Sequence, residues 1–397
     1  GRAMKRAGLF VETACRQASC ANRAPCGDSF LQRQFPAQGH TVLVLSDGMG
    51  HGVKAHLLSM LTASIFQGMA GAPQSIEETA RMVMRTLPVC SVRRISYSTF
   101  TLVDIDHRSE RVRLIEYDNP QAFVFREGMP MEVEREAHPY AGSQTGRRQV
   151  FYTSSFTMRC GDRLVLTTDG VTQSGLGSDR YPFGWGREAV ADFLGGLLRR
   201  EPEMAPGVWA QRVLDRAVEL DGSRPKDDIT CVAVQVREPR RAMLCSCPPS
   251  LTADIARLAD RIRGFEGRKI VCGHLLAQQV AGYWGRELRQ RLTSTDPELP
   301  PEWEIEGLDL VTEGLLTLSK VLDILEHYAE RPRGRGPAYH ICELLLASDR
   351  IELVVGMRRS NTAAADTETL ILRRKVLGAI AQTLERGFAK QVVTTYL

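Results

Sequence analysis

The feature that most limits the fold of this chain is an aspartate at the end of an apolar run, with glycine directly after it. The run Val42–Ser46 leads to Asp47 and then Gly48. The run Leu164–Thr168 leads in the same way to Asp169. Short apolar runs bounded by turn formers predict buried β-strands, so each carboxylate is expected at a rigid strand end. Glycine beside the acid lets the backbone approach closely as well.

Two further segments carry acids in related positions. Asp227 and Asp228 come directly before the apolar run Ile229–Val234, and Asp28 follows Gly27 in a turn. Several carboxylates that converge would repel one another unless divalent cations neutralised them. Oxygen ligands of this kind suit magnesium or manganese, and two such ions can activate a water for attack on phosphorus. Since Asp-Gly is also a common structural turn, the residues alone leave both interpretations open.

The surrounding pattern predicts a mainly antiparallel, β-rich domain from residue 8 to about 240. Two pairs of helices interrupt the strands, at Ala55–Phe66 with Ile76–Leu87, and within 187–219 around a breaker at Glu201–Pro206. The expected strands are Gly8–Ala14, Thr41–Ser46, Phe100–Asp106, Arg111–Tyr117, Gln121–Arg126, Arg163–Thr168 and Cys231–Val236. The sequence therefore predicts one domain over 1–240.

A different pattern begins after Arg237–Arg241. Residues 241–397 alternate short apolar runs with long helical stretches, which predicts a separate, smaller α/β domain. The expected elements include a strand at Lys269–Cys272 and helices at Leu275–Leu292, Leu315–Ala329 and Leu372–Arg386. Gly273 lies between a strand and a helix, as in phosphate-binding turns, but a single glycine there is equally an ordinary connection. A regulatory or partner-binding role is the expectation for this domain.

Composition and charge bear on the binding partners and the cellular location of the protein. The 397 residues carry a net charge of only +4, without a block of like charges, which argues against nucleic-acid binding. No run approaches the ~18 apolar residues that span a bilayer, so no membrane segment is expected. The expected location is the cytoplasm, with reduced thiols.

Cysteines offer a weak alternative metal site. Cys15, Cys20 and Cys26 lie close together, and Cys245 with Cys247 forms a C-x-C pair. None of these spacings repeats the paired C-x-x-C pattern of zinc or iron–sulfur sites. Structural thiols are the preferred interpretation.

Three motifs carry a family resemblance. The segments Ser46–Gly52, Gly161–Val171 and Asp227–Thr230 resemble the signatures of PPM (type 2C) protein phosphatases, and specifically the bacterial stage II sporulation protein E-like branch. The resemblance covers roughly residues 8–240. It implies an α+β fold, an αββα sandwich of two antiparallel sheets flanked by helices. It also implies metal-dependent hydrolysis of phosphoserine and phosphothreonine. The smaller α/β domain expected from the pattern of residues 241–397 follows this sandwich.

The resemblance also implies a site. Asp47 would bridge two manganese or magnesium ions, with room for a third ion, and the metal-activated water would act without a phosphoenzyme. The implied catalytic residues are Asp28, Asp47, Asp169 and Asp227. The implied metal ligands are Asp28, Asp47, the Gly48 carbonyl, Asp169, Asp227 and, ranked after Asp227, Asp228. His51, between two glycines, fits a loop residue better than a general acid.

The helices within 53–87 follow directly from the Asp47–Gly48 turn. In relatives such helices form a regulatory or dimer-forming element, which implies a homodimer and gating by a partner. The opposing interpretation is that Leu57, Leu58, Leu61 and Ile65 are core. The expected function is an enzyme acting on a phosphorylated regulatory protein in bacterial signalling. The alternative is a catalytically weak phosphatase-like signalling module that binds a partner.

Overall fold

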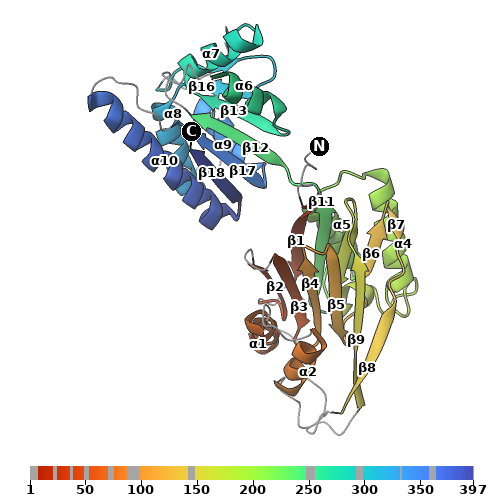
Figure 1. The fold of residues 1–397 in the computed structure, drawn as a ribbon. Coiled ribbons are helices and arrows are strands. Elements are labelled where there is room, and N and C mark those ends of the chain that lie inside the picture. Colours follow the sequence, from red (N-terminus) through yellow and green to blue (C-terminus); the bar gives the residue numbers. More distant parts are fainter. Residues whose placement is uncertain are drawn as a thin grey trace. The chain divides into compact units, whose positions relative to one another are not determined.

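The computed structural model describes residues 8–20, 25–35, 39–48, 53–69, 76–86, 98–141, 148–246, 255–291, 298–330, 333–356 and 364–396. The chain divides into two compact units, Gly1–Glu238 and Pro239–Leu397 (Figure 1). His51 lies outside the described residues.

Two antiparallel sheets form the N-terminal unit. One has the order β1-β11-β10-β6-β7 and the other β2-β3-β4-β5-β9-β8. Their strands are β1 (Phe10–Ala18), β2 (Asp28–Phe35), β3 (His40–Asp47), β4 (Phe100–Asp106), β5 (Arg111–Tyr117), β6 (Phe123–Arg126), β7 (Met129–Pro130), β8 (Arg135–Ala141), β9 (Arg148–Thr157), β10 (Arg163–Thr167) and β11 (Ile229–Arg237). The helices are α1 (Val53–Met69), α2 (Ile76–Thr86), α3 (Asp169–Thr172), α4 (Arg187–Arg200) and α5 (Pro206–Leu220).

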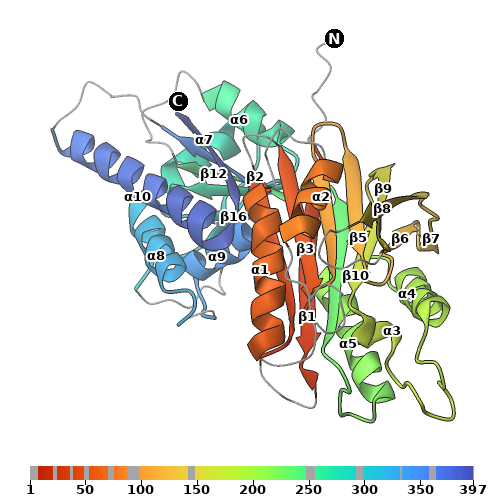
Figure 2. The same cartoon turned by 90° about the horizontal axis from the view of Figure 1, so that it is seen from below.

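The layers follow from the alternation of side chains along buried strands. Leu43 and Leu45 of β3 pack into the core between the two sheets, while Val42 and Val44 pack on the opposite face. That second face is covered by α1 and α2, and α4 and α5 cover the outer face of the other sheet (Figure 2). Both faces of β3 are therefore buried, which explains its continuous apolar run. The predicted αββα sandwich is confirmed.

Some predicted boundaries were wrong, and four strands of this unit, β2, β7, β8 and β9, were not predicted. The first strand runs over Phe10–Ala18, rather than Gly8–Ala14. Of these, β7 has only two residues, and β2, β8 and β9 are rich in polar residues. β2 and β8 are edge strands of their sheet and β9 is only partly buried, so the hydrophobic pattern there is weak.

The C-terminal unit is an α/β domain, as predicted. Its strands are β12 (Arg241–Ser246), β13 (Arg268–Cys272), β14 (Arg289–Gln290), β15 (Trp303–Glu304), β16 (Leu310–Thr312), β17 (Arg350–Val355) and β18 (Gln391–Tyr396). Its helices are α6 (Ile255–Gly264), α7 (His274–Trp284), α8 (Leu315–Glu326), α9 (Pro337–Leu346) and α10 (Ala364–Phe388). α6 and α7 pack on one face of the sheet and α8, α9 and α10 on the other (Figure 1).

Helix ends in this unit differ from the prediction for identifiable reasons. The helix expected at Leu275–Leu292 stops at Trp284, because Gly285 adopts the left-handed conformation that ends helices. The helix expected from Leu372 begins earlier, at Ala364. Within the described segments, no helix combines the length and the apolar character needed to cross a bilayer.

Candidate active site

The first pair of acids lies on neighbouring strands. Asp28 at the start of β2 is the register partner of Asp47 at the end of β3. Side chains at directly opposed positions of an antiparallel pair lie on the same face, so the two carboxylates are neighbours. The Gly48 amide also donates a 3.3 Å hydrogen bond to the Gly27 carbonyl. The turns around Asp28 and Asp47, 19 positions apart in sequence, are thus held together.

The second group of acids comes from the other sheet. Asp169 follows β10, and Asp227 and Asp228 precede β11, which pairs with β10. A Cβ on Gly170 would lie 2.0 Å from the Asp228 carbonyl oxygen, so only glycine permits this close approach of the two turns. Gly170 of the Asp-Gly motif is therefore required for packing, because it allows the turn that contains Asp169 to lie directly against the turn that contains Asp227.

Buried threonines hold the Asp28 carboxylate on one side only. Thr168 and Thr230 donate hydrogen bonds of 2.8 and 2.6 Å to Asp28 Oδ2. The other oxygen, Oδ1, is buried and has no hydrogen-bond partner among the residues described. The Asp169 side chain shows the same asymmetry: Gln173 donates to Oδ2 at 2.8 Å, whereas Oδ1 is buried and, within the described chain, lacks a partner. Two carboxylate oxygens are thus left without the donor that burial normally requires.

The charges of these acids act on one another. Burial raises the pKa of Asp47 to about 10, and the charges of Asp28, Asp169 and Asp227 add to the rise. Burial raises the pKa of Asp28 to about 7, against hydrogen bonds from Thr230 and Thr168 that lower it. The pKa of Asp169 is also raised, again chiefly by burial. A group of mutually repelling carboxyls needs positive charge to ionise fully.

These residues fit a divalent cation. The unmet oxygens belong to carboxylates, which magnesium and manganese prefer, and neither acid is committed to an ion pair among the described residues. Among those residues, no three side chains of His, Cys, Asp or Glu already stand as a closed ligand cluster. Without a counter-ion, repulsion between the carboxylates is expected to hold them further apart than they would lie around a bound cation.

Asp228 differs from the other acids. It is 3% exposed, and its Oδ1 and Oδ2 each accept a backbone N–H at 2.8 Å, from Cys20 and from Gly27. These two hydrogen bonds hold Cys20 and Gly27, the two ends of the segment that leads into Asp28. Asp227, by contrast, is exposed and accepts a 2.8 Å hydrogen bond from the Asp228 amide.

The helix α1 packs directly on the Gly48 turn. A Cβ at Gly48 would lie 1.9 Å from the Ala55 carbonyl oxygen in the first turn of the helix. Val53, Leu57 and Leu61 are 62%, 63% and 48% exposed, so the interpretation of Leu57 and Leu61 as core was wrong. The side chains of Leu58 and Ile65 lie outside the described part of the structure.

Sequence reasoning missed the polar residues that position these acids. Thr168 and Thr230 lie within the quoted motifs. Only their positions, directly before Asp169 and two residues after Asp228, could have drawn attention to them. Asn119 was not singled out at all. It accepts a hydrogen bond from the Thr99 hydroxyl, and the Thr99 amide donates to the Asp47 carbonyl at 2.9 Å.

The raised pKa values predict how the metal-free protein responds to pH. A carboxyl whose folded pKa is raised stabilises the fold at low pH, and this contribution is lost as pH rises from the unfolded pKa through the folded one. For Asp28 and Asp47 the loss should run upward from about pH 4, through about 7, toward about 10. Urea unfolding in EDTA should therefore show stability falling over this window, and manganese should reverse the fall. The slope should be shallower in Asp47→Asn; an equal slope would contradict the assignment.

Comparisons with known proteins bear on the N-terminal unit. Residues 37–237 match the family described as stage II sporulation protein E (SpoIIE). The Bacillus subtilis (strain 168) stage II sporulation protein E is 22% identical over 229 residues, 57% of this chain and 26% of that protein. The Priestia megaterium protein of the same name is 23% identical over 229 residues, 57% of this chain and 36% of that protein. The chain thus spans about a quarter to a third of these relatives.

Solved structures of phosphatase domains are also similar to this chain. The phosphatase domain of SpoIIE from Bacillus subtilis shares 18% identity, with a TM-score of 0.44, over 59% of this chain and 95% of that one. The SiaA-PP2C domain of Pseudomonas aeruginosa shares 21% identity, with a TM-score of 0.41, over 56% and 85%. Because the family match at 37–237 covers half of the sequence, the chain belongs to the stage II sporulation protein E family, a branch of the PPM-type phosphatases.

Proposed function

We propose that this protein hydrolyses phosphoserine or phosphothreonine on a regulatory protein, using manganese or magnesium. The observation that carries the proposal is the meeting of acids from two sheets, with buried, unpartnered oxygens on Asp28 and Asp169. Such an arrangement costs folding free energy unless it binds a cation. Family membership agrees with this chemistry.

The proposed ligands are Asp28, Asp47 with the Gly48 carbonyl, Asp169 and Asp227. Asp47 is the central residue because the charges of Asp28, Asp169 and Asp227 all act on its carboxyl. Thr168 and Thr230 orient Asp28 so that Oδ1 stays available. Two ions bound there, or three, would supply a water of lowered pKa and positive charge for a phosphate, without a phosphoenzyme. We assign Asp228 a positioning role, since both its oxygens accept backbone amides.

The test is metal-dependent turnover by the full chain. Manganese should support release of phosphate from p-nitrophenyl phosphate and from phosphoserine peptides, and EDTA should abolish it reversibly. The competing function is a signalling module of weak or absent activity that binds a partner. Metal binding by calorimetry without turnover of either substrate would favour that module. Absence of both metal binding and turnover would overturn the proposed site.

We also propose an oligomeric state, a form of regulation and a cellular location. A homodimer through the helices at 53–87, with gating by a partner, is supported by the exposed apolar stripe Val53, Leu57 and Leu61 on α1. It is also supported by the close packing of Ala55 on Gly48, which couples the helix to the site. We propose a setting in cytoplasmic bacterial signalling. The eight described cysteines are all free thiols, as a reducing compartment would have them.

A further inference from the structure

The loop at 173–186 connects α3 to α4, and its two limbs are held against each other. The Trp185 amide donates a 2.8 Å hydrogen bond to the Ser174 carbonyl. The Gly186 amide donates a hydrogen bond of 2.8 Å to the Thr172 carbonyl. Trp185 is also 5% exposed and packs in the core under α4 and α5. The loop is therefore an ordered part of the domain, like other compact loops that are packed by their own side chains.

The two limbs also meet near the tip of the loop. The Gly177 amide donates a 3.4 Å hydrogen bond to the Pro182 carbonyl. This contact brings Leu176, directly before Gly177, and Phe183, directly after Pro182, onto adjacent limbs. Leu176 is 44% exposed and Phe183 is 90% exposed. The tip therefore presents two apolar side chains to solvent.

Phe183 differs from the other aromatic residues of the loop. Tyr181 is partly buried and packs, like Trp185, with the core under α4 and α5. Phe183 lies between them in sequence, and its exposure exceeds that of every other large apolar side chain in the described part of the chain. Burial of a phenylalanine is strongly favourable, and this one contributes almost none of that free energy to the fold. The ring is thus available to a partner.

The second limb packs against the residue that hydrogen-bonds to Asp169. A Cβ on Gly184 would lie 2.8 Å from the Gln173 Cα, so glycine allows this close approach. Gln173 in turn donates a 2.8 Å hydrogen bond to Asp169 Oδ2. Neighbouring Cα atoms are roughly 3.8 Å apart, so the Phe183 Cα lies within about 8 Å of the Gln173 Cα. Phe183 is therefore close to the proposed metal site.

The first limb is joined to the turn that contains Asp227. The Lys226 ammonium group donates a 2.7 Å hydrogen bond to the Leu176 carbonyl. The Asp221 carboxylate accepts a hydrogen bond from the Gly175 amide at 2.7 Å and one from the Lys226 amide at 3.0 Å. The two limbs are thus connected to two of the acids proposed as metal ligands.

The composition of the loop favours an apolar partner. Its charged residues are Asp179 and Arg180, whose formal charges cancel. Apolar contact and not ion pairing would therefore supply the free energy of binding. Single exposed apolar residues need no partner, but Leu176 and Phe183 are adjacent on an ordered loop beside the proposed site. Aromatic side chains are enriched among the residues that dominate protein–protein contacts.

A phosphorylated residue held among the acids would place its flanking chain beside this loop. The Gln173 amide donates to the Asp169 carbonyl at 2.7 Å, so the two residues are one helical turn, or about 6 Å, apart. The Phe183 Cα then lies within about 14 Å of the Asp169 Cα. An extended peptide covers roughly 3.3–3.6 Å per residue, so about four residues span this distance.

We propose that Leu176 and Phe183 form a docking surface for the substrate protein. The docking surface receives an apolar side chain that lies within about four residues of the phosphorylated serine or threonine. This inference rests on the proposed phosphatase function and adds a determinant of substrate choice to it. The two residues bind the substrate and take no part in the chemistry.

Kinetics with matched substrates test the docking surface, using the full chain with manganese. The substrates are p-nitrophenyl phosphate, a phosphoserine peptide of alanine and glycine, and the same peptide with one leucine two, three or four residues before or after the phosphoserine. At least one leucine peptide should exceed the alanine peptide in kcat/KM by about fivefold or more, mainly through a lower KM. p-Nitrophenyl phosphate has no flanking chain, so it reports on the catalytic centre alone.

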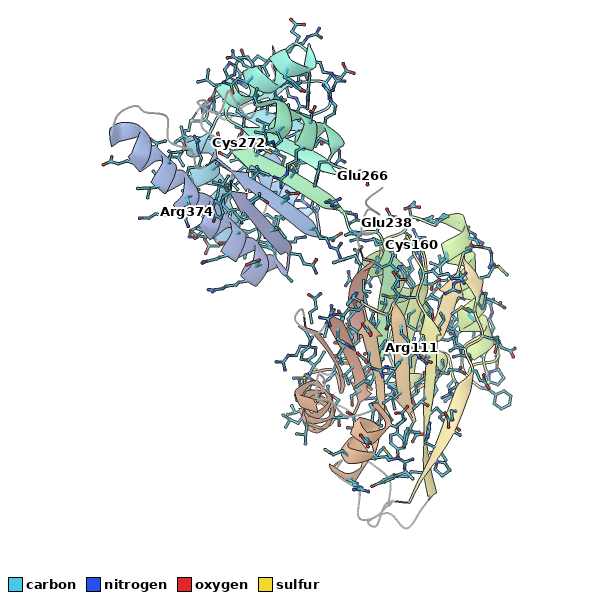
Figure 3. The ribbon with its side chains drawn as sticks, viewed as in Figure 1. Arg111, Cys160, Glu238, Glu266, Cys272 and Arg374 are labelled. Carbon is cyan, nitrogen blue, oxygen red and sulfur yellow. The ribbon has the colours of Figure 1, made fainter. Side chains whose placement is uncertain are left out.

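Two exposed apolar residues give a matched pair of variants. Phe183→Ala should remove the advantage of the leucine peptide and leave hydrolysis of p-nitrophenyl phosphate within about twofold. Met129→Ala is the control, since Met129 is 56% exposed and belongs to β7. β7 pairs with the end of β6 that meets the beginning of β10, the end of the sheet where Cys160 is labelled in Figure 3. Asp169 follows the other end of β10, so Met129→Ala should keep the advantage.

The outcomes separate the docking surface from the phosphatase function. Phe183→Trp should retain the preference for leucine, because a large apolar ring is kept. Hydrolysis of p-nitrophenyl phosphate without any preference for leucine, or equal losses in Phe183→Ala and Met129→Ala, would overturn the docking surface and leave the phosphatase function in place. Absence of turnover on every substrate would contradict the phosphatase function, and the docking surface with it.

Discussion

Asp47→Asn is expected to reduce manganese-dependent hydrolysis of p-nitrophenyl phosphate by at least about 100-fold, or about 2.7 kcal/mol of transition-state stabilisation. The substitution keeps the shape of the side chain and removes the charge on which Asp28, Asp169 and Asp227 all act. An amide has one acceptor oxygen and cannot bridge two cations as a carboxylate can. The measurement is the initial rate against manganese concentration. Metal affinity by calorimetry should fall together with the rate.

Asp192→Asn is the control for this substitution. Asp192 is an exposed residue of α4, so it loses the same charge at a distance from the acids that converge. Its rate should stay within about twofold of the unmodified chain. Removing one of several repelling carboxyls should leave Asp47→Asn at least as stable as the parent in EDTA. Full activity in Asp47→Asn would show that hydrolysis does not depend on this centre.

Asp228→Ala is expected to lower the free energy of unfolding of the metal-free chain by about 2 to 5 kcal/mol. The side chain is 3% exposed, and its loss leaves the backbone amides of Cys20 and Gly27 without their 2.8 Å acceptors. Buried donors without acceptors are expensive, and these two fix the segment that delivers Asp28. Urea unfolding in EDTA measures the effect directly. Activity should fall as a consequence, because Asp28 loses its support.

The substitutions Asp227→Asn and Asp228→Asn distinguish a metal ligand from a residue that positions the ligands. Asp227 is exposed and contributes to the raised pKa of Asp47, so its replacement should weaken metal binding while metal-free stability is kept. Asp228→Asn retains one acceptor oxygen, and its amide group presents N–H to a backbone N–H, so an intermediate loss of stability is expected. If Asp228→Asn lost metal affinity at unchanged stability, Asp228 would be a ligand and not a positioning residue.

Much of the N-terminal fold was predictable because its strands are buried on both faces. A strand such as β3 can be predicted from its continuous apolar run, and turn formers mark its ends. The αββα layering followed from the family resemblance. Strands with an exposed face or edge carry polar residues, and β2, β8 and β9 were missed for that reason. Asp28 was placed in a glycine turn, whereas it is the first residue of β2.

The sequence by itself determined where acids meet strand ends, that two domains follow one another, and that glycines must stand beside Asp47 and Asp169. Only the tertiary structure decided how each polar group is used. The carboxylate of Asp228 accepts hydrogen bonds from the backbone amides of Cys20 and Gly27, about 200 residues away. Hydrogen bonds and charges act over a few ångströms in space, and sequence patterns report only the local conformation of the backbone. Which carboxylate is satisfied, and which is left for a ligand, is therefore decided by residues that the chain brings together from far apart.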